Sequence, residues 1–144
     1  PSFCAQFVEL VVDLAERIAA LPGRRIVYTN GSAPYAARVL AHRGLDGLFD
    51  EIFGVEHADF HPKPDPAAYL AALQALDVAA SQAIALEDSP NGVLAAKRAG
   101  LYCVAVPNSM TCGLAFDRAD LQVTSLADLS LDALLAHERR SRLP

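Results

Sequence analysis

A chain of 144 residues is long enough for one domain with a single hydrophobic core. Its 53% hydrophobic and 20% charged residues are typical of a soluble globular α/β protein and exclude a disordered chain. The net charge of −5 argues against a nucleic-acid surface, and no apolar run approaches the roughly 18 residues of a membrane span. Cys4, Cys103 and Cys112 follow no metal-binding or redox spacing, so we expect small buried side chains in a reducing, cytoplasmic environment.

Residues that favour helix and strand alternate along the chain. Apolar residues recur every three to four positions over 3–21, which predicts an amphipathic helix. Short apolar runs then predict strands, and Ser32, Asp65 and Ser89 stand where helix N-caps are expected. This alternation predicts one Rossmann-like α/β domain over 1–144, a three-layer fold with a mostly parallel sheet. The expected strands are 26–28, 51–55, 83–86, 101–106 and an edge strand at 121–123, and the later helices are 35–43, 66–76, 90–99 and one that Ser130 caps and that ends at 137.

Polar side chains follow two of the expected strands. Thr29 and Asn30 offer a hydroxyl and an amide before a helix N-terminus, whose free N–H groups favour an anion. Glu87 and Asp88 follow the run 83–86, and two adjacent carboxylates are most easily tolerated beside a cation. Each has a plain structural alternative: Thr29 and Asn30 could simply end a strand and turn the chain, and the acid pair could be a solvated loop.

Lys63 lies between two prolines, which restrict the backbone and would hold the lysine in one direction. A surface lysine in a stiff loop is the alternative. A hydroxyl, a fixed cation and paired carboxylates at one sheet edge suit a phosphate beside a hard divalent cation, Mg²⁺ in particular. We interpret the other polar residues of this region as turn and surface residues and not as transition-metal ligands: Asp46, Asp50, Glu56, His57, Asp59 and His61.

Three short segments resemble the motifs of a known family. Residues 26–32 read IVYTNGS, residues 62–65 read PKPD and residues 86–92 read LEDSPNG. In this order they resemble the second, third and fourth motifs of the haloacid dehalogenase (HAD) superfamily, across nearly the whole chain. The first segment is similar to pyrimidine 5′-nucleotidase-like members. The third, together with residues 104–108, is similar to β-phosphoglucomutase-like and sugar-phosphatase members.

The resemblance implies roles for these residues. Thr29 and Lys63 would be catalytic: Thr29 would bind the transferring phosphoryl oxygens, assisted by the backbone around Asn30, and Lys63 would offset the charge of the phosphate and the nucleophile. Glu87 and Asp88 would hold Mg²⁺, directly or through water. The implied activity is a Mg²⁺-dependent phosphomonoester phosphatase acting through an aspartyl-phosphate. Its substrate would be a small phosphorylated metabolite, a nucleoside monophosphate or a sugar phosphate.

The first motif of the family is not found in this sequence. That motif is an apolar strand ending in Asp-x-Asp, in which the first aspartate is the nucleophile and the second is the acid/base. Asp13 is the nearest candidate, but Ala15 takes the second position and the surroundings have helical periodicity, so we reject it. We therefore expect an N-terminally truncated core domain that lacks the nucleophile strand and the cap, is inactive alone, and begins with the helix that follows the cap.

The missing strand has a structural consequence. In the family's sheet order it is central, between the strand that ends at Thr29 and the strand that ends at Glu87. Without it, two apolar strand edges lose their partners. We expect the chain to rearrange, to be poorly stable, or to associate with itself through these edges.

Two other functions fit the same residues. A β-phosphoglucomutase-like phosphomutase would transfer the phosphoryl group to a sugar and not to water. A non-catalytic HAD-like remnant would act as an interaction module. The sequence does not identify the substrate, because in this family specificity lies mostly in the cap.

Overall fold

The structure, a computed structural model, describes residues 14–21, 23–130 and 132–136 of the chain. Residues 14–20 are helical, which confirms that part of the first predicted helix, while residues 3–13 of the prediction lie outside the described residues. At the other end, residues 132–136 are helical and the N–H of Ala133 donates to Ser130 Oγ at 3.1 Å, so the predicted cap is confirmed.

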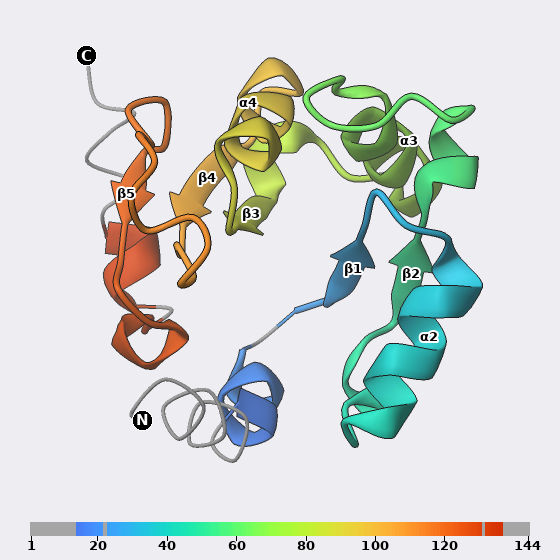
Figure 1. The fold of residues 1–144 in the computed structure, drawn as a ribbon, viewed down its shortest axis with the longest axis horizontal. Coiled ribbons are helices and arrows are strands. Elements are labelled where there is room, and N and C mark those ends of the chain that lie inside the picture. The colour runs from blue at the N-terminus through green and yellow to red at the C-terminus, as the bar shows by residue number, and fades with distance from the viewer. Residues whose placement is uncertain (1–13, 22, 131, 137–144) are drawn as a thin grey trace.

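The predicted order of strands and helices is confirmed, with ends that differ by a few residues (Figure 1). Ser32 and Ser89 cap two helices as expected, because their hydroxyl oxygens accept the N–H groups of Tyr35 and Gly92. The strands are β1 (Ile26–Tyr28), β2 (Glu51–Phe53), β3 (Ile84–Glu87), β4 (Tyr102–Ala105) and β5 (Leu121–Gln122), and the helices are α2 (Ala33–His42), α3 (Ala67–Leu76) and α4 (Pro90–Arg98).

The strands form two separate parallel sheets. In the first, β1 pairs with β2 from Ile26↔Glu51 to Tyr28↔Phe53. In the second, β3, β4 and β5 lie in that order and every pair is parallel. Figure 1 shows β1 and β3 on the facing sides of the two sheets, and no strand of the described residues joins them. The predicted parallel α/β fold is confirmed, with its sheet divided at one position.

Among residues 14–21, 23–130 and 132–136, the facing edges of β1 and β3 pair with no further strand. Thr29 N donates to Phe53 O at 3.0 Å, and Val106 N donates to Glu87 O at 2.7 Å, so these groups are used within each sheet. Backbone groups of successive residues point to opposite sides of a strand, so those of Tyr28 and Leu86 point away from β2 and β4. Within the described part of the chain they meet no neighbouring strand. This agrees with the expected loss of a partner, and self-association through these edges remains a prediction.

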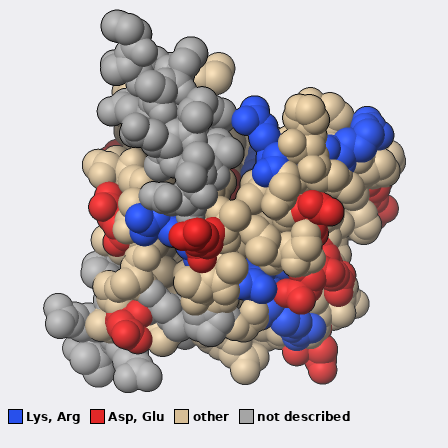
Figure 2. Space-filling model, turned by 90° about the horizontal axis from the view of Figure 1, so that it is seen from below, with Lys and Arg blue, Asp and Glu red and all other residues tan. Residues whose placement is uncertain are grey.

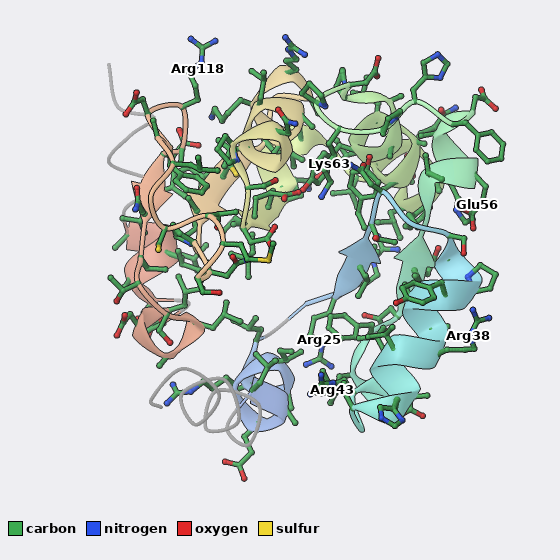
Figure 3. The ribbon with its side chains drawn as sticks, in the orientation of Figure 1. Arg25, Arg38, Arg43, Glu56, Lys63 and Arg118 are labelled. Carbon is green, nitrogen blue, oxygen red and sulfur yellow. The ribbon has the colours of Figure 1, made fainter. Side chains whose placement is uncertain are left out.

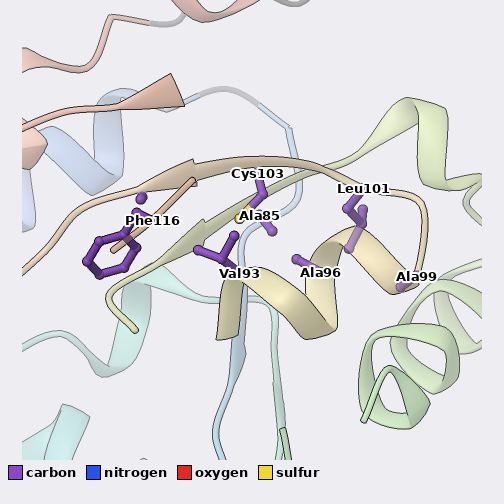
Figure 4. Packing of buried hydrophobic residues seen from close by; sticks show 8 residues of the cluster. Ala85, Val93, Ala96, Ala99, Leu101, Cys103 and Phe116 are labelled. Atoms are coloured by element: carbon purple, nitrogen blue, oxygen red, sulfur yellow. The ribbon is translucent and has the colours of Figure 1, made fainter. Parts of the chain in front are cut away.

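The core surrounds β4, whose four residues are all buried. Alternate side chains of a strand point to opposite faces, so Cys103 packs towards α4 beside Val93 and Phe116 (Figure 4). Tyr102 and Val104 pack on the other face against Leu134. The three-stranded sheet is therefore covered by α4 on one side and by Leu129 and Leu134 on the other, which gives three layers. The prediction of a buried cysteine is correct for Cys103 and wrong for Cys112, which is exposed in the loop after β4.

The surface carries both signs of charge. On the face shown in Figure 2, acidic and basic side chains of the described residues are interspersed. Within residues 14–21, 23–130 and 132–136, no helix combines the length and the apolar character needed to cross a membrane.

The divided sheet predicts unequal protection of neighbouring amides. In the monomeric chain, the amides of Tyr28 and Leu86 should exchange with deuterium faster than those of Thr29 and Val106, because only the latter donate to an adjacent strand. Hydrogen exchange followed by NMR measures this. Protection of Tyr28 and Leu86 that rises with protein concentration would indicate self-association. Equal protection of all four amides in the dilute monomer would contradict the divided sheet.

Candidate active site

Lys63 and Glu87 form a buried ion pair at the carboxyl end of β3. Lys63 Nζ lies 2.6 Å from Glu87 Oε1, and the two side chains are only 12% and 4% exposed. Figure 3 places Lys63 where the two sheets approach each other. The hydroxyl of Tyr69, on α3, donates to the same carboxylate oxygen. The structure therefore brings two of the predicted site residues into direct contact and adds a third residue that the sequence analysis read only as part of a helix.

Two aromatic rings flank the lysine. Its Nζ lies 4.4 Å from the ring centroid of Tyr28 and 5.7 Å from that of Tyr69, within range of cation–π attraction. The rings meet edge to face, with centroids 4.9 Å apart. Burial, and then the negative charges of Glu87 and Asp65, raise the pKa of Tyr28 to about 12. Burial and Glu87 also raise the pKa of Tyr69, so both hydroxyls keep their protons at neutral pH.

The loop after β1 holds the lysine loop in place. Asn30 Oδ1 accepts a hydrogen bond from the backbone N of Lys63 at 2.9 Å. Thr29 Oγ1 accepts the N–H of Gly31 at 3.0 Å, which leaves the hydroxyl hydrogen of Thr29 free to donate. The Asn30 side chain thus fixes the position of Lys63, while Thr29 follows the end of β1 and its side chain accepts from Gly31.

The N-terminus of α2 is closed to a ligand at two of its N–H groups. Ala33 N donates to Glu56 Oε1 at 2.8 Å, and Tyr35 N donates to Ser32 Oγ at 3.3 Å. Hydrogen bonds from the backbone of Glu56 and from Ala33 lower the pKa of Glu56, which keeps an anion at the positive end of the helix. The interpretation of Glu56 as a solvent residue is therefore wrong, whereas anion binding beside Thr29 and Asn30 stays a prediction. Gly54 makes the contact possible, because a Cβ there would overlap Ala33 N.

Glu87 and Asp88 point in different directions, although they are adjacent in sequence. Glu87 is buried, whereas Asp88 is exposed and its Oδ2 accepts a hydrogen bond from Asn108 Nδ2 at 2.9 Å. This separation follows from strand geometry, in which successive side chains alternate. The mutual repulsion of the two acids is relieved by separate partners, Lys63 for one and Asn108 for the other.

The donor set suits a hard cation at Asp88 more than at Glu87. The side chain of Asp88 is exposed, and its carboxylate oxygens are the type of ligand that Mg²⁺ prefers. Glu87 Oε1 already accepts two hydrogen bonds, and Oε2 lies against Gly92. Among the described residues, no three or more His, Cys, Asp or Glu side chains gather into a metal site. The assignment of Glu87 and Asp88 to Mg²⁺ therefore remains a prediction, with Asp88 the better-placed ligand.

Three residues of the site carried a signal that was not used. Tyr69 stood in the apolar pattern of α3, but a tyrosine whose ring is buried usually needs a hydrogen-bond partner. Tyr28 is the last residue of a predicted strand and directly precedes Thr29. Asn108 follows β4, as Thr29 follows β1, and a further polar residue after a strand at the same sheet edge was a reason to include it.

The fold and this cluster are those of a HAD-like domain. The sequence model of the haloacid dehalogenase-like hydrolase family matches residues 3–100. The chain belongs to this family.

Several relatives are phosphatases or bind phosphate. The chain is 43% identical over 101 residues to YhcW of Bacillus subtilis (strain 168), covering 69% of this chain and 46% of that protein. It is 45% identical over 78 residues to validoxylamine A 7′-phosphate phosphatase of Streptomyces hygroscopicus subsp. limoneus, covering 54% and 36%. The crystal structure of CbbY from Rhodobacter sphaeroides in complex with phosphate is 35% identical with a TM-score of 0.75, covering 85% and 56%. A mutant CbbY in complex with xylulose-(1,5)bisphosphate matches with a TM-score of 0.71. The chain thus spans less than two thirds of each relative.

Gly92 makes room for the buried carboxylate. A Cβ at this position would overlap Glu87 Oε2. The substitution Gly92→Ala should displace Glu87 and lower the free energy of unfolding by about 3 kcal/mol, the scale of breaking a buried ion pair. Helix propensity alone predicts the opposite sign, because alanine favours a helix over glycine by about 1 kcal/mol.

Urea denaturation of Gly92→Ala and of a control, Gly47→Ala, measures this difference. A Cβ at Gly47 meets no atom within 4 Å, so the control should change stability by less than about 0.5 kcal/mol. A Gly92→Ala variant that is as stable as the parent chain would show that Glu87 does not occupy this position.

Proposed function

We propose that this chain is the core domain of a Mg²⁺-dependent phosphomonoester phosphatase. The observation that carries the proposal is the buried lysine beside two strand ends with oxygen donors, Thr29 after β1 and Asp88 after β3. A cation held in a low-dielectric site interacts strongly with an anion, and a phosphate dianion is the ligand that this charge suits. Membership of a hydrolase family with phosphatase relatives supports the same activity.

Each residue has a distinct proposed role. Lys63 binds a phosphoryl oxygen with an N–H that Glu87 does not use, since an ammonium group has three donors. Thr29 donates its free hydroxyl hydrogen to a second oxygen, and the backbone at Asn30 assists. Asp88 would hold Mg²⁺, with Glu87 contributing through water. The metal ion, when bound, would neutralise negative charge on the phosphoryl oxygens.

The proposal places the nucleophile outside residues 1–144, because these residues contain no Asp-x-Asp motif. An Asp-x-Asp strand between β1 and β3 would pair with both free edges and carry the attacking aspartate to the carboxyl ends of β1 and β3. Its first carboxylate would attack the phosphorus while the second gives a proton to the leaving alcohol, and water would then release phosphate from the acyl-phosphate. We call residues 1–144 preceded by such a strand and a cap the extended chain.

The substrate proposed is a phosphorylated sugar or sugar-like metabolite. Two relatives support this class, one named for validoxylamine A 7′-phosphate and one crystallised with xylulose-(1,5)bisphosphate. Nucleoside monophosphates are the second class to include in a substrate panel.

Activity of the extended chain tests the proposal. It should release phosphate from sugar phosphates only with Mg²⁺, and Asp88→Asn or Lys63→Ala should lower kcat/KM by roughly 100-fold or more, the scale for removing a charge that stabilises the transition state. Asp46→Asn, at an exposed turn, is the matched control and should stay within about two-fold.

Two results would contradict the assignment. Unchanged activity in Asp88→Asn or Lys63→Ala would remove these residues from the site. Measurable phosphate release by residues 1–144 alone would show that the nucleophile lies within them.

A further inference from the structure

Glu87 accepts hydrogen bonds from two side chains, and not only from the lysine whose charge it neutralises. Its Oε1 accepts a hydrogen bond from Lys63 Nζ at 2.6 Å and a second from the hydroxyl of Tyr69. Its side chain is 4% exposed, so water contributes little to its solvation. The charge of this carboxylate is therefore shared between a cation and a neutral donor.

The two tyrosines of the cluster contact Lys63 and Glu87 in different ways. Tyr28 presents its ring to the ammonium group at 4.4 Å, while its hydroxyl is buried and has no hydrogen-bond partner within the described residues. Tyr69 has its ring farther from Nζ, at 5.7 Å, and directs its hydroxyl to Glu87. Tyr28 acts on Lys63 through its ring, and Tyr69 acts on Glu87 through its oxygen.

We infer that Tyr69 is a positioning residue of the phosphate site, whose hydroxyl draws charge from Glu87 and so leaves the charge of Lys63 available to the substrate anion. This inference rests on the proposed function. It gives a role to a residue of α3 that lies outside the strand ends and the lysine loop.

Little water screens Lys63 and Glu87, so the balance of their charges decides how strongly the site attracts an anion. A lysine paired with a carboxylate that has no other partner is close to neutral as a unit and attracts an anion weakly. A hydrogen bond to a charged group is among the stronger protein hydrogen bonds, so the Tyr69 hydroxyl disperses a substantial part of the Glu87 charge.

The chain connects these groups through a short path. Tyr69 is the third residue of α3, which begins directly after the loop that holds Lys63. Asp65 Oδ1 accepts the N–H of Ala67 at 2.8 Å and fixes the start of that helix. Tyr69 also packs against the core cluster beneath α4, so its hydroxyl is held against Glu87 by the same contacts that form the core.

The test compares two variants of the extended chain, each of which lacks the hydroxyl of one tyrosine. Tyr69→Phe should raise KM for a sugar phosphate by about ten-fold, with kcat within about two-fold, because Lys63 binds the phosphate dianion in both ground and transition states. The dissociation constant of inorganic phosphate, measured by calorimetry without turnover, should rise by a similar factor. Tyr35→Phe removes a hydroxyl from a ring of α2 that is 59% exposed, and should leave both constants within about two-fold.

The outcomes separate a positioning role from a structural one. If Tyr69 only stabilised the fold, Tyr69→Phe would lower kcat through a smaller folded fraction and leave KM and the phosphate constant unchanged. That result would overturn the inference, and so would equal effects of Tyr69→Phe and Tyr35→Phe. An extended chain without phosphatase activity would instead contradict the proposed function, and calorimetry with phosphate would still test the effect of Tyr69.

Discussion

The geometry of the site depends on the buried ion pair between Lys63 and Glu87. Removing two charges from water costs several kcal/mol for each, and their attraction offsets this only when the pair is close and further hydrogen bonds are made. The structure meets both conditions, with a 2.6 Å contact and a second donor from Tyr69. Asn30 fixes the backbone of the lysine, and Gly92 leaves space for the carboxylate. Residues from two loops, one strand and two helices are therefore arranged around one contact.

The ion pair also lies where the two parallel sheets approach each other. Lys63 follows β2 in the chain and contacts the ring of Tyr28 on β1, while Glu87 ends β3. The pair thus connects the two-stranded sheet with the three-stranded sheet at the edge where the strands end. The free edges of β1 and β3 lie beside it, so a strand that joined the sheets would end at the same place as the lysine and the acids. The proposed phosphatase site therefore lies at the position where the sheet is divided, between β1 and β3.

What the sequence predicted was local, and what it missed was distant in the chain. Ser32 and Ser89 were predicted as caps because their partners are three residues away, and the strands were predicted from short apolar runs. Glu56 reaches the start of α2 across 23 residues, and Tyr69 reaches Glu87 across 18, so no local pattern marked either contact. The pairing of Lys63 with Glu87 was not predicted either. The motifs indicated which residues form the site but not that the acids would separate, one buried with the lysine and one exposed beside Asn108.

A double-mutant cycle on the 144-residue chain tests the central claim most directly. The free energy of unfolding in urea would be measured for Lys63→Met, Glu87→Gln and the double variant. Each single substitution should lower stability by about 3 kcal/mol, because it leaves the other charge buried without a partner. The double variant should lose less free energy of unfolding than the two single variants lose together, with a coupling energy of about 2 kcal/mol or more. Effects that add to within about 0.5 kcal/mol would show that the two side chains do not depend on each other and would contradict the account.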